Sequence, residues 1–126
     1  MTMKLEVVPV PVTDVDRVKA FYYEQVGFKT DIDQTVHEGL RFVHLTPPGS
    51  ACSIAIGEGI VGTPPGSIEG VLLVIDDADG ARAELAERGI EVSKVDEQPW
   101  GRFVHIADPD GNRWSLQQLS PKAFGS

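Results

Sequence analysis

The chain has 126 residues, a length that fits one domain with a hydrophobic core of its own. Nineteen Asp and Glu against eleven Lys and Arg give a net charge of −8 at pH 7, so neither nucleic acid nor an anionic membrane is expected as a partner. The single cysteine, Cys52, cannot form an internal disulfide, and neither a signal peptide nor a membrane-spanning apolar run is apparent, so we expect a cytoplasmic protein.

The N-terminal half begins with an apolar, β-rich run at residues 6–13, followed by Asp14 as a candidate helix N-cap. An apolar stripe at helical spacing follows and stops at Gly27, which can adopt the left-handed conformation that ends a helix. Three further strands are expected, at about 28–34, 41–45 and 51–57. The half therefore reads strand–helix–strand–strand–strand.

The C-terminal half repeats this order at an offset near 62 residues. An apolar strand at 69–77 precedes a helix with Asp77 as N-cap, and the helix stops at Gly89. The sequence RFVHL at 41–45 returns as RFVHI at 102–106, and the turn sequence ADPDGN follows. The remaining strands are expected at about 90–96, 102–106 and 113–119.

The repeat predicts an α+β fold built from two βαβββ modules. Module one spans about 4–57, a Gly- and Pro-rich linker covers 58–67, and module two spans about 68–119. In each module one helix can cover one face of the sheet, which leaves the other face bare. Because two modules can enclose their bare faces around a cleft, we expect residues 1–126 to form a single domain.

Three stretches resemble the vicinal oxygen chelate superfamily, the group of glyoxalases, bleomycin-resistance proteins and extradiol dioxygenases. They are PVTDVDRVKAFYYEQVGF at 11–28, TPPGSACSIAIG at 46–57 and PWGRFVHIADPDGNRWSLQQL at 99–119. The resemblance implies paired modules whose sheets form an open, cupped barrel around a small-molecule site. It also implies a homodimer, because many members are homodimers.

Metal-using members of this superfamily bind a divalent ion through His or Glu at fixed strand positions. In this sequence those positions fall on Val7, Gly70 and Ser115, and the first-half equivalent of Ser115 is taken to be Ser53. A divalent ion needs about three imidazole or carboxylate donors. The acids that precede Val7 and Gly70 would point to the opposite face of each strand. We therefore expect no metal and no other cofactor.

Two histidines at equivalent positions of the repeat, His44 and His105, are the main candidates for function. By strand alternation, Phe42 shares the face of His44, and Phe103 shares the face of His105. The imidazoles could hydrogen-bond a ligand, act as acid or base, or hold a metal in a two-histidine site, in that order of preference. Alternatively, both histidines are sheet residues bonded to their neighbours.

Polar and aromatic residues near the histidines complete the predicted site. Ser115 and Gln117 share the cup face of the last strand, and Ser53 is placed with them from the first half. Trp100 precedes the 102–106 strand, where it could stack on a ligand at the lip of the cup. Packing or satisfaction of a polar cavity would explain these residues equally well.

Three large residues are expected to point away from the cup. Trp114 alternates with Ser115 and is predicted to lie in the core beneath the helix. Arg41 and Arg102 alternate with the histidines and are predicted to form surface ion pairs.

The leading hypothesis is a metal-independent protein that binds a small aromatic or polycyclic molecule through Phe42, Phe103, Trp100 and the two histidines. Resistance proteins of the superfamily sequester drugs in this way. The alternative is a lyase, isomerase or glyoxalase-like enzyme that uses His44 and His105 as catalytic residues, with or without a divalent metal. A third interpretation is a module that keeps the fold and binds nothing.

Overall fold

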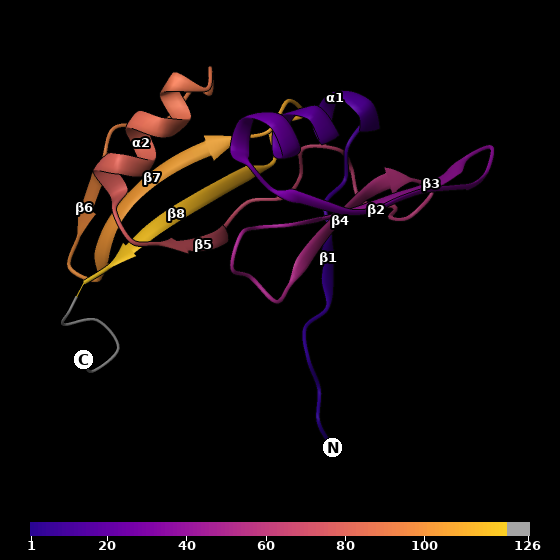
Figure 1. The fold of residues 1–126 in the computed structure, drawn as a ribbon, viewed down its shortest axis with the longest axis horizontal. Helices are drawn as coiled ribbons and strands as arrows, with labels where there is room; N and C mark the ends of the chain where they lie inside the picture. Colours follow the sequence, from indigo (N-terminus) through magenta and orange to yellow (C-terminus); the bar gives the residue numbers. More distant parts are fainter. Residues whose placement is uncertain (121–126) are drawn as a thin grey trace. The chain divides into compact units, whose positions relative to one another are not determined.

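The computed structural model describes residues 1–120, and the chain forms two βαβββ modules (Figure 1). In the first module the elements are β1 (Val7–Pro9), α1 (Val15–Ala20), the π-helical η1 (Phe21–Val26), β2 (Lys29–His37), β3 (Leu40–Thr46) and β4 (Ser53–Glu58). In the second they are β5 (Val71–Ile75), α2 (Ala78–Glu87), β6 (Asp96–Gln98), β7 (Gly101–Ala107) and β8 (Arg113–Leu119). The predicted order of elements is confirmed in both halves.

Each module has its own four-stranded mixed sheet. The strand orders are β1-β4-β3-β2 and β5-β8-β7-β6, so the two sheets have the same topology. In both, the first strand of the module runs parallel to the last, and the other neighbours are antiparallel. Within residues 1–120, each sheet has four strands and does not close into a barrel. The predicted α+β class with two βαβββ modules is confirmed.

The chain divides into two compact units that match the two modules, except that one turn of module two belongs to the first unit. The first unit holds residues 1–68 and 108–112, and the second holds 69–107 and the chain after 112. This turn, residues 108–112, joins β7 to β8. Its Asn112 is fully buried, and the Asn112 side-chain amide donates to the backbone oxygen of Pro11 at 2.9 Å. This turn therefore takes part in the packing of the first unit.

The first helix begins and ends as the sequence predicts, but its last turn differs. Asp14 Oδ1 accepts from the backbone N–H of Arg17 at 3.2 Å, and Gly27 has the left-handed φ of 97°. Between them, residues 21–26 are π-helical, and the Tyr22 carbonyl accepts from the N–H groups of both Gly27 and Phe28. This arrangement stacks the buried Tyr22 ring on Phe28, with centroids 5.5 Å apart.

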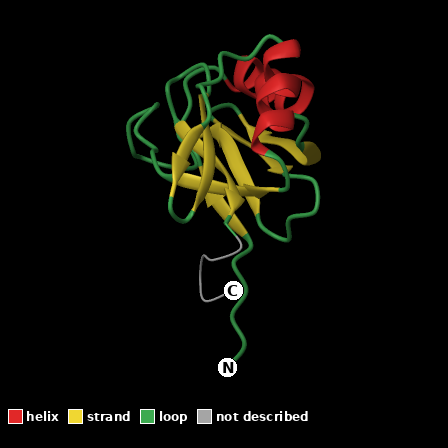
Figure 2. Ribbon diagram, turned by 90° about the vertical axis from the view of Figure 1, so that its left-hand side faces the viewer, coloured by secondary structure: helices red, strands yellow, loops and turns green. Residues whose placement is uncertain are grey.

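Within each unit, the helix packs on one face of the sheet (Figures 1 and 2). Alternate residues of the central strands point toward the helix and form the core with the buried residues of the helical segments. The strand residues are Val43, Leu45, Ile54 and Ile56 in the first unit and Val104, Ile106, Trp114 and Leu116 in the second, and the helical residues are Val18 and Tyr22 in the first unit and Ala78 and Leu85 in the second. The predicted core position of Trp114 is confirmed.

The second strand of module two is much shorter than predicted. A strand was expected at about 90–96, but β6 covers only Asp96–Gln98. Beside β7, Ser93 replaces part of the regular ladder, because its Oγ accepts from the backbone N–H of His105 at 2.9 Å. A serine side chain thus accepts the hydrogen bond that a strand carbonyl would accept in a regular ladder.

Among residues 1–120, no helix combines the length and apolar character needed to cross a membrane.

Candidate functional site

In each unit, the sheet face opposite the helix carries part of the predicted site. In the first unit, Phe42 and His44 lie next to each other on β3, with ring centroids 5.6 Å apart. Ser53 is on β4, and its Oγ lies 2.5 Å from the hydroxyl of Thr46, which also bonds the Asp31 carboxylate. The structure therefore brings Phe42 and His44 together. Ser53, at the start of β4, is hydrogen-bonded to Thr46 and not to either of these two residues.

The second unit gathers a more connected group around His105. The imidazole stacks on Phe103, with centroids 6.2 Å apart and planes 11° apart. His105 is directly opposite Ser115 in the β7–β8 ladder, and its Nδ1 lies 2.9 Å from Ser115 Oγ. Its other nitrogen, Nε2, lies 3.6 Å from Asp96 Oδ2 on β6. A carboxylate, an imidazole and a hydroxyl thus form a row across three neighbouring strands.

The two histidines are at equivalent strand positions but have different partners. His105 is opposite Ser115, whereas His44 is opposite Ala55. The strand register thus makes Ala55 the counterpart of Ser115, and the expectation that Ser53 fills this position is wrong. Because Ala55 has no polar side-chain atom, only the second module can form the cross-strand imidazole–hydroxyl bond.

Gln117 and Trp100 are linked through the backbone at one end of this face. Gln117 lies opposite Phe103, is only 2% exposed, and its amide donates to the Trp100 carbonyl oxygen at 3.1 Å. The Trp100 side chain itself is 52% exposed. Gln117 therefore supports the β7–β8 hairpin, and the Trp100 ring is left accessible.

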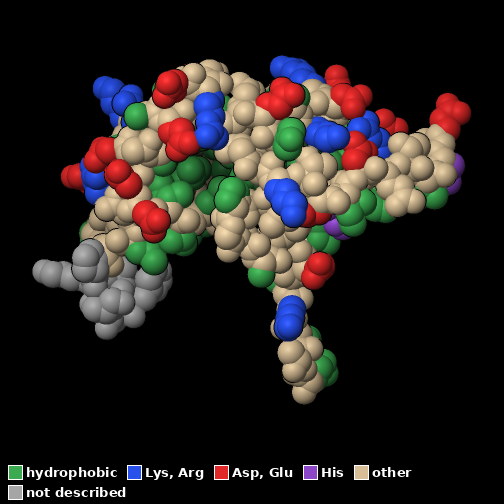
Figure 3. Space-filling view, in the orientation of Figure 1, with side chains coloured by type: hydrophobic (Ala, Val, Ile, Leu, Met, Phe, Trp, Pro, Cys, Tyr) green, Lys and Arg blue, Asp and Glu red, His purple; other side chains and the backbone are tan. Residues whose placement is uncertain are grey.

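Apolar side chains that no sequence pattern had indicated flank the same face. Leu72 lies opposite Ser115 and Val74 opposite Gln117 in the β5–β8 pair. Leu72, Val74 and Leu119 are 49%, 62% and 41% exposed. Figure 3 shows hydrophobic side chains gathered on this unit, with charged groups around them. The continuous apolar run at 71–75 concealed which of its residues would face outward, because both faces of such a strand are apolar.

The positions where the superfamily resemblance implies a divalent ion lack suitable donors. Val7 is paired with Ser53 and offers no side-chain ligand. Gly70 has no side chain, and the hydroxyl of Ser115 is engaged by His105. Within residues 1–120, no three His, Cys, Asp or Glu side chains lie close enough to hold a metal ion together. The side chains at these positions do not fit a divalent ion.

Arg41 forms ion pairs on the helix-facing side, as predicted. Its guanidinium donates to Asp16 Oδ1 and to Asp33 Oδ2, both at 2.9 Å, and Lys19 also bonds Asp33 at 2.8 Å. Hydrogen bonds from Arg41 and then Lys19 lower the pKa of Asp33 to about 2. The same bond to Asp33 raises the pKa of Arg41 further above its ordinary range.

Arg102 makes a corresponding set of contacts in the second unit. It donates to Asp79 Oδ2 at 2.7 Å and to Glu97 Oε1 at 3.0 Å. Its hydrogen bond lowers the pKa of Asp79, and Asp79 raises the pKa of Arg102. The prediction that both arginines form surface ion pairs is confirmed.

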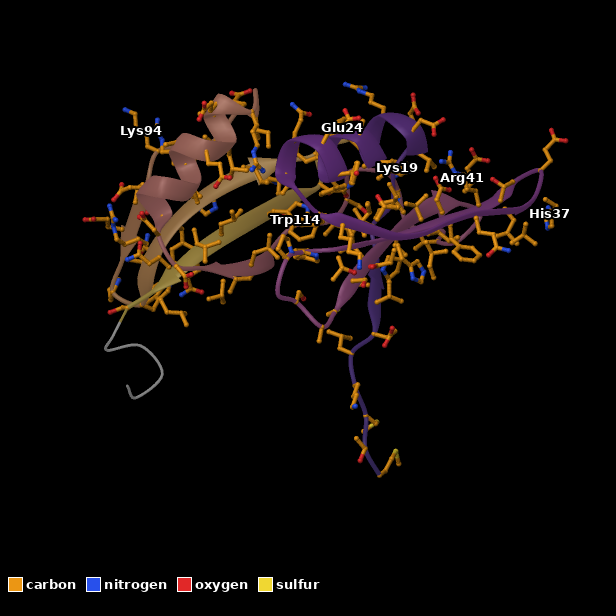
Figure 4. The ribbon with its side chains drawn as sticks, in the orientation of Figure 1. Lys19, Glu24, His37, Arg41, Lys94 and Trp114 are labelled. Atoms are coloured by element: carbon orange, nitrogen blue, oxygen red, sulfur yellow. The ribbon has the colours of Figure 1, made fainter. Side chains whose placement is uncertain are left out.

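A pocket of about 530 Å³ in the first unit has none of the predicted site residues in its lining. It is lined by Asp16, Lys19, Ala20, Tyr23, Glu24, Lys29 and Thr30, from α1, η1 and the start of β2. Figure 4 shows Lys19 and Glu24 on the helical segment beside it, and His37 far off at the β2–β3 hairpin. Its lining charges include both signs, and Lys19 is bound to Asp33. No motif in the sequence points to this pocket.

Two βαβββ modules in one chain, each with a helix on a four-stranded mixed sheet, are the fold of the glyoxalase-like proteins. The model of the Glyoxalase/Bleomycin resistance protein/Dioxygenase superfamily matches residues 4–116, and the chain belongs to this superfamily. The resemblance seen in the sequence is thereby confirmed.

Several solved structures are similar over nearly the whole chain. TnmS3, an antibiotic-binding protein from Streptomyces sp. CB03234, is 38% identical with a TM-score of 0.86, over 94% of this chain and 98% of its own. A glyoxalase/bleomycin resistance protein from the same organism is 39% identical with a TM-score of 0.80, over 91% and 100%. A superfamily member from Sphaerobacter thermophilus DSM 20745 is 30% identical with a TM-score of 0.81, over 92% and 97%.

Proposed function

We propose that the protein binds a small aromatic or polycyclic molecule, of the kind found among antibiotics, without a metal. The similarity to TnmS3 carries this proposal, because an antibiotic-binding protein shares 38% identity across 94% of the chain. Two features of the chain support it. The implied metal positions lack donors, and the open face of module two combines exposed apolar groups with the His105–Ser115 pair.

The residues proposed to contact the ligand supply stacking and hydrogen bonds. Phe103 and His105 already form a parallel pair, and a flat ligand can extend such a stack. The exposed Trp100 ring offers a second aromatic surface. On the open face of module two the proposed contacts are Trp100, Phe103, His105 and Ser115, with Gln117 proposed to hold the Trp100 backbone in place. On the open face of module one the proposed contacts are Phe42, His44 and Ser53.

Fluorescence titration tests ligand binding directly, because the two tryptophans differ in exposure. Trp100 is 52% exposed and Trp114 is 2% exposed, so a ligand at the site should quench Trp100 selectively. Titration with a panel of polycyclic aromatic antibiotics should give saturable quenching, confirmed by calorimetry. In Trp100→Phe the quenching should disappear while calorimetric binding weakens by only a few-fold.

A binding-site variant and a matched control complete the test. Phe103→Ala should reduce affinity by about tenfold or more, because it removes the ring that stacks on His105. Val36→Ala, an exposed apolar change on β2, should leave affinity unaltered. Absence of binding across the panel, or stoichiometric Ni, Zn, Fe or Mn in purified protein, would contradict the proposed function.

We further propose a cytoplasmic homodimer that does not bind nucleic acid. The resemblance to the superfamily supports self-association, because many of its members are homodimers. The free thiol of Cys52 is compatible with a reducing compartment. Light scattering after size exclusion should give twice the chain mass of 13.6 kDa. A monomer at micromolar concentration would contradict the dimer without affecting the ligand proposal.

A further inference from the structure

We propose that Asp96, His105 and Ser115 form a proton-controlled relay that sets whether Ser115 accepts or donates a hydrogen bond to the ligand. The inference rests on the proposed function for its biological meaning, since it assumes that this face contacts a ligand. Its physical basis is the row of three side chains on β6, β7 and β8. The consequence is a change in the preferred ligand chemistry with pH.

The position of Asp96 determines the hydrogen-bond direction in the neutral state. A neutral imidazole has one N–H donor and one acceptor nitrogen. Asp96 Oδ2 lies 3.6 Å from Nε2, and a nearby carboxylate favours a proton on the nitrogen that faces it. The other nitrogen, Nδ1, is then the acceptor in the 2.9 Å contact with Ser115. Ser115 must donate its only proton to His105, which leaves lone pairs for a donor on the ligand.

Protonation of His105 reverses this bond. In the imidazolium form both ring nitrogens carry protons, so Nδ1 becomes a donor to Ser115 Oγ. The Ser115 hydroxyl proton is then free to turn toward the ligand. Acid favours the imidazolium form, so lowering the pH shifts the contact with Ser115 toward this reversed direction. The site should therefore favour aromatic hydroxyl groups at pH 8 and aromatic carbonyl or ether oxygens at pH 5.

The other charged groups on neighbouring elements are already engaged or directed elsewhere. Glu97 on β6 is bound to Arg102 at 3.0 Å, and it pairs with that residue rather than with His105. Arg113 on β8 is held by Glu69 at 2.9 Å. Lys94, in the segment joined to His105 through Ser93, lies at the outer margin of the unit in Figure 4. Asp96 is thus the carboxylate that acts on the imidazole.

The internal repeat provides a comparison within the same chain. His44 occupies the equivalent strand position, but the residue opposite it is Ala55. That imidazole has no hydroxyl across the ladder, so it cannot pass a change of protonation to a neighbouring donor. The relay is accordingly confined to module two.

The hydrogen-bond direction can be measured without any ligand. Two-bond ¹⁵N–¹H NMR correlation spectra report which imidazole nitrogen carries the proton, and the His105→Gln and His44→Gln variants assign the signals. At pH 8, His105 should be the Nε2–H tautomer. In Asp96→Asn the population of that tautomer should fall, because the carboxylate that favours it is gone. An Nδ1–H tautomer in the unaltered protein at pH 8 would overturn the relay.

The ligand consequence is tested with two probes of equal ring size, 2-naphthol and 2-methoxynaphthalene. The first can donate a hydrogen bond and the second can only accept one. The ratio of their affinities should change by about tenfold between pH 8 and pH 5, the equivalent of one gained or lost hydrogen bond. This change should vanish in Ser115→Ala and persist in Ser50→Ala, a serine of the β3–β4 loop.

The outcomes separate the relay from the proposed function. If both probes bind but the ratio is independent of pH, or if Ser115→Ala keeps the pH effect, the relay is wrong while binding stands. If neither probe nor any antibiotic of the panel binds, the proposed function fails, and the NMR measurement alone still decides the direction of the His105–Ser115 bond.

Discussion

Arg41 on β3 and Arg102 on β7 make the same two kinds of contact at equivalent places in the two modules. Each guanidinium bonds an acid in the first turn of its helix, Asp16 or Asp79. Each also bonds an acid on the neighbouring edge strand, Asp33 for Arg41 and Glu97 for Arg102. In both modules the repeated RFVH sequence therefore supplies an arginine whose ion pairs link the helix to the edge strand, and a histidine on the opposite face of the sheet.

The first prediction concerns acid stability and Asp33. The pKa of Asp33 is lowered to about 2, so its ion pairs stabilise the fold above the unfolded-state pKa of about 4. This contribution is lost as the pH falls from about 4 toward 2, because the folded state must then take up the proton. Asp33→Asn should be less stable than the unaltered protein by about 1 kcal/mol at pH 7, with the difference vanishing near pH 2. Urea unfolding at several pH values measures this.

Glu91→Gln is a suitable control for that experiment, because Glu91 is an exposed acid outside the Arg41 network. Its stability difference from the unaltered protein should be small throughout the same pH range. An Asp33→Asn variant whose stability difference is independent of pH would show that the ion pairs contribute nothing.

The second prediction compares the two arginines. The Arg41 side chain is 18% exposed and its partner Asp33 is 26% exposed, whereas Arg102 is 33% exposed and its partner Asp79 is 67% exposed. Solvent screens the second set more strongly. Arg41→Ala should therefore destabilise the protein by about 1–2 kcal/mol, and Arg102→Ala should cost clearly less. Thermal unfolding at low and at molar salt measures both, and equal losses at low salt would contradict the ranking.

The order of elements could be predicted because each half of the sequence carries the same local signals. Asp14 and Gly27 mark the ends of the first helical segment, and period-two alternation places Phe42 and His44 on one strand face. The same alternation correctly placed Arg41 on the other face. Local rules of capping and alternation were sufficient for these features.

The pairing partners of the site residues could not be predicted in the same way. His44 and His105 are 61 residues apart, and the residues opposite them, Ala55 and Ser115, are 60 apart, because the turn at 47–52 is one residue longer than the turn at 108–112. The comparison of the two halves by sequence alone used an offset of 62 for the last strands, and it therefore put Ser53 in the place of Ala55. This two-residue error kept Ser53 on the correct face, because side chains alternate with a period of two. It still concealed the difference between the two histidines.

The third prediction concerns Asn112, in the turn at residues 108–112 between β7 and β8. Its side chain donates to the Pro11 carbonyl oxygen and to Asp108 Oδ2, and accepts from the N–H of Ile68 at 3.1 Å. Asn112→Ala removes the partner of the Pro11 carbonyl oxygen and of the Ile68 N–H, while Asp108 Oδ2 keeps its bond from the Tyr22 hydroxyl, and it should cost about 2–4 kcal/mol. Denaturant unfolding measures the loss. Asp110→Ala, which removes the more exposed contact to Thr13, should cost under about 1 kcal/mol.

The same experiment tests our proposal that residues 1–126 form one domain. The turn 108–112 packs in the first unit and is flanked on both sides by strands of the second. Weakening it should lower the stability of both units together, with one transition seen by Trp114 fluorescence and by circular dichroism. Two separate transitions in the unaltered protein would show that the modules are independent domains.

The last prediction concerns Gly57, the residue opposite Phe42 in the β3–β4 ladder. A Cβ atom at Gly57 would lie within 3.0 Å of the backbone carbonyl of Arg41, and backbone cannot move aside as a flexible side chain can. Gly57→Ala should therefore force the two strands apart and cost about 1–3 kcal/mol, as overpacking does. It should also weaken ligand binding in proportion to the contribution of Phe42. Gly62→Ala is the matched control, because nothing lies within 4 Å of its added methyl group and its stability should be unchanged or slightly raised. A Gly57→Ala variant as stable as Gly62→Ala would mean that β3 and β4 separate here without cost, and Phe42 would then lack the rigid support that a stacking residue requires.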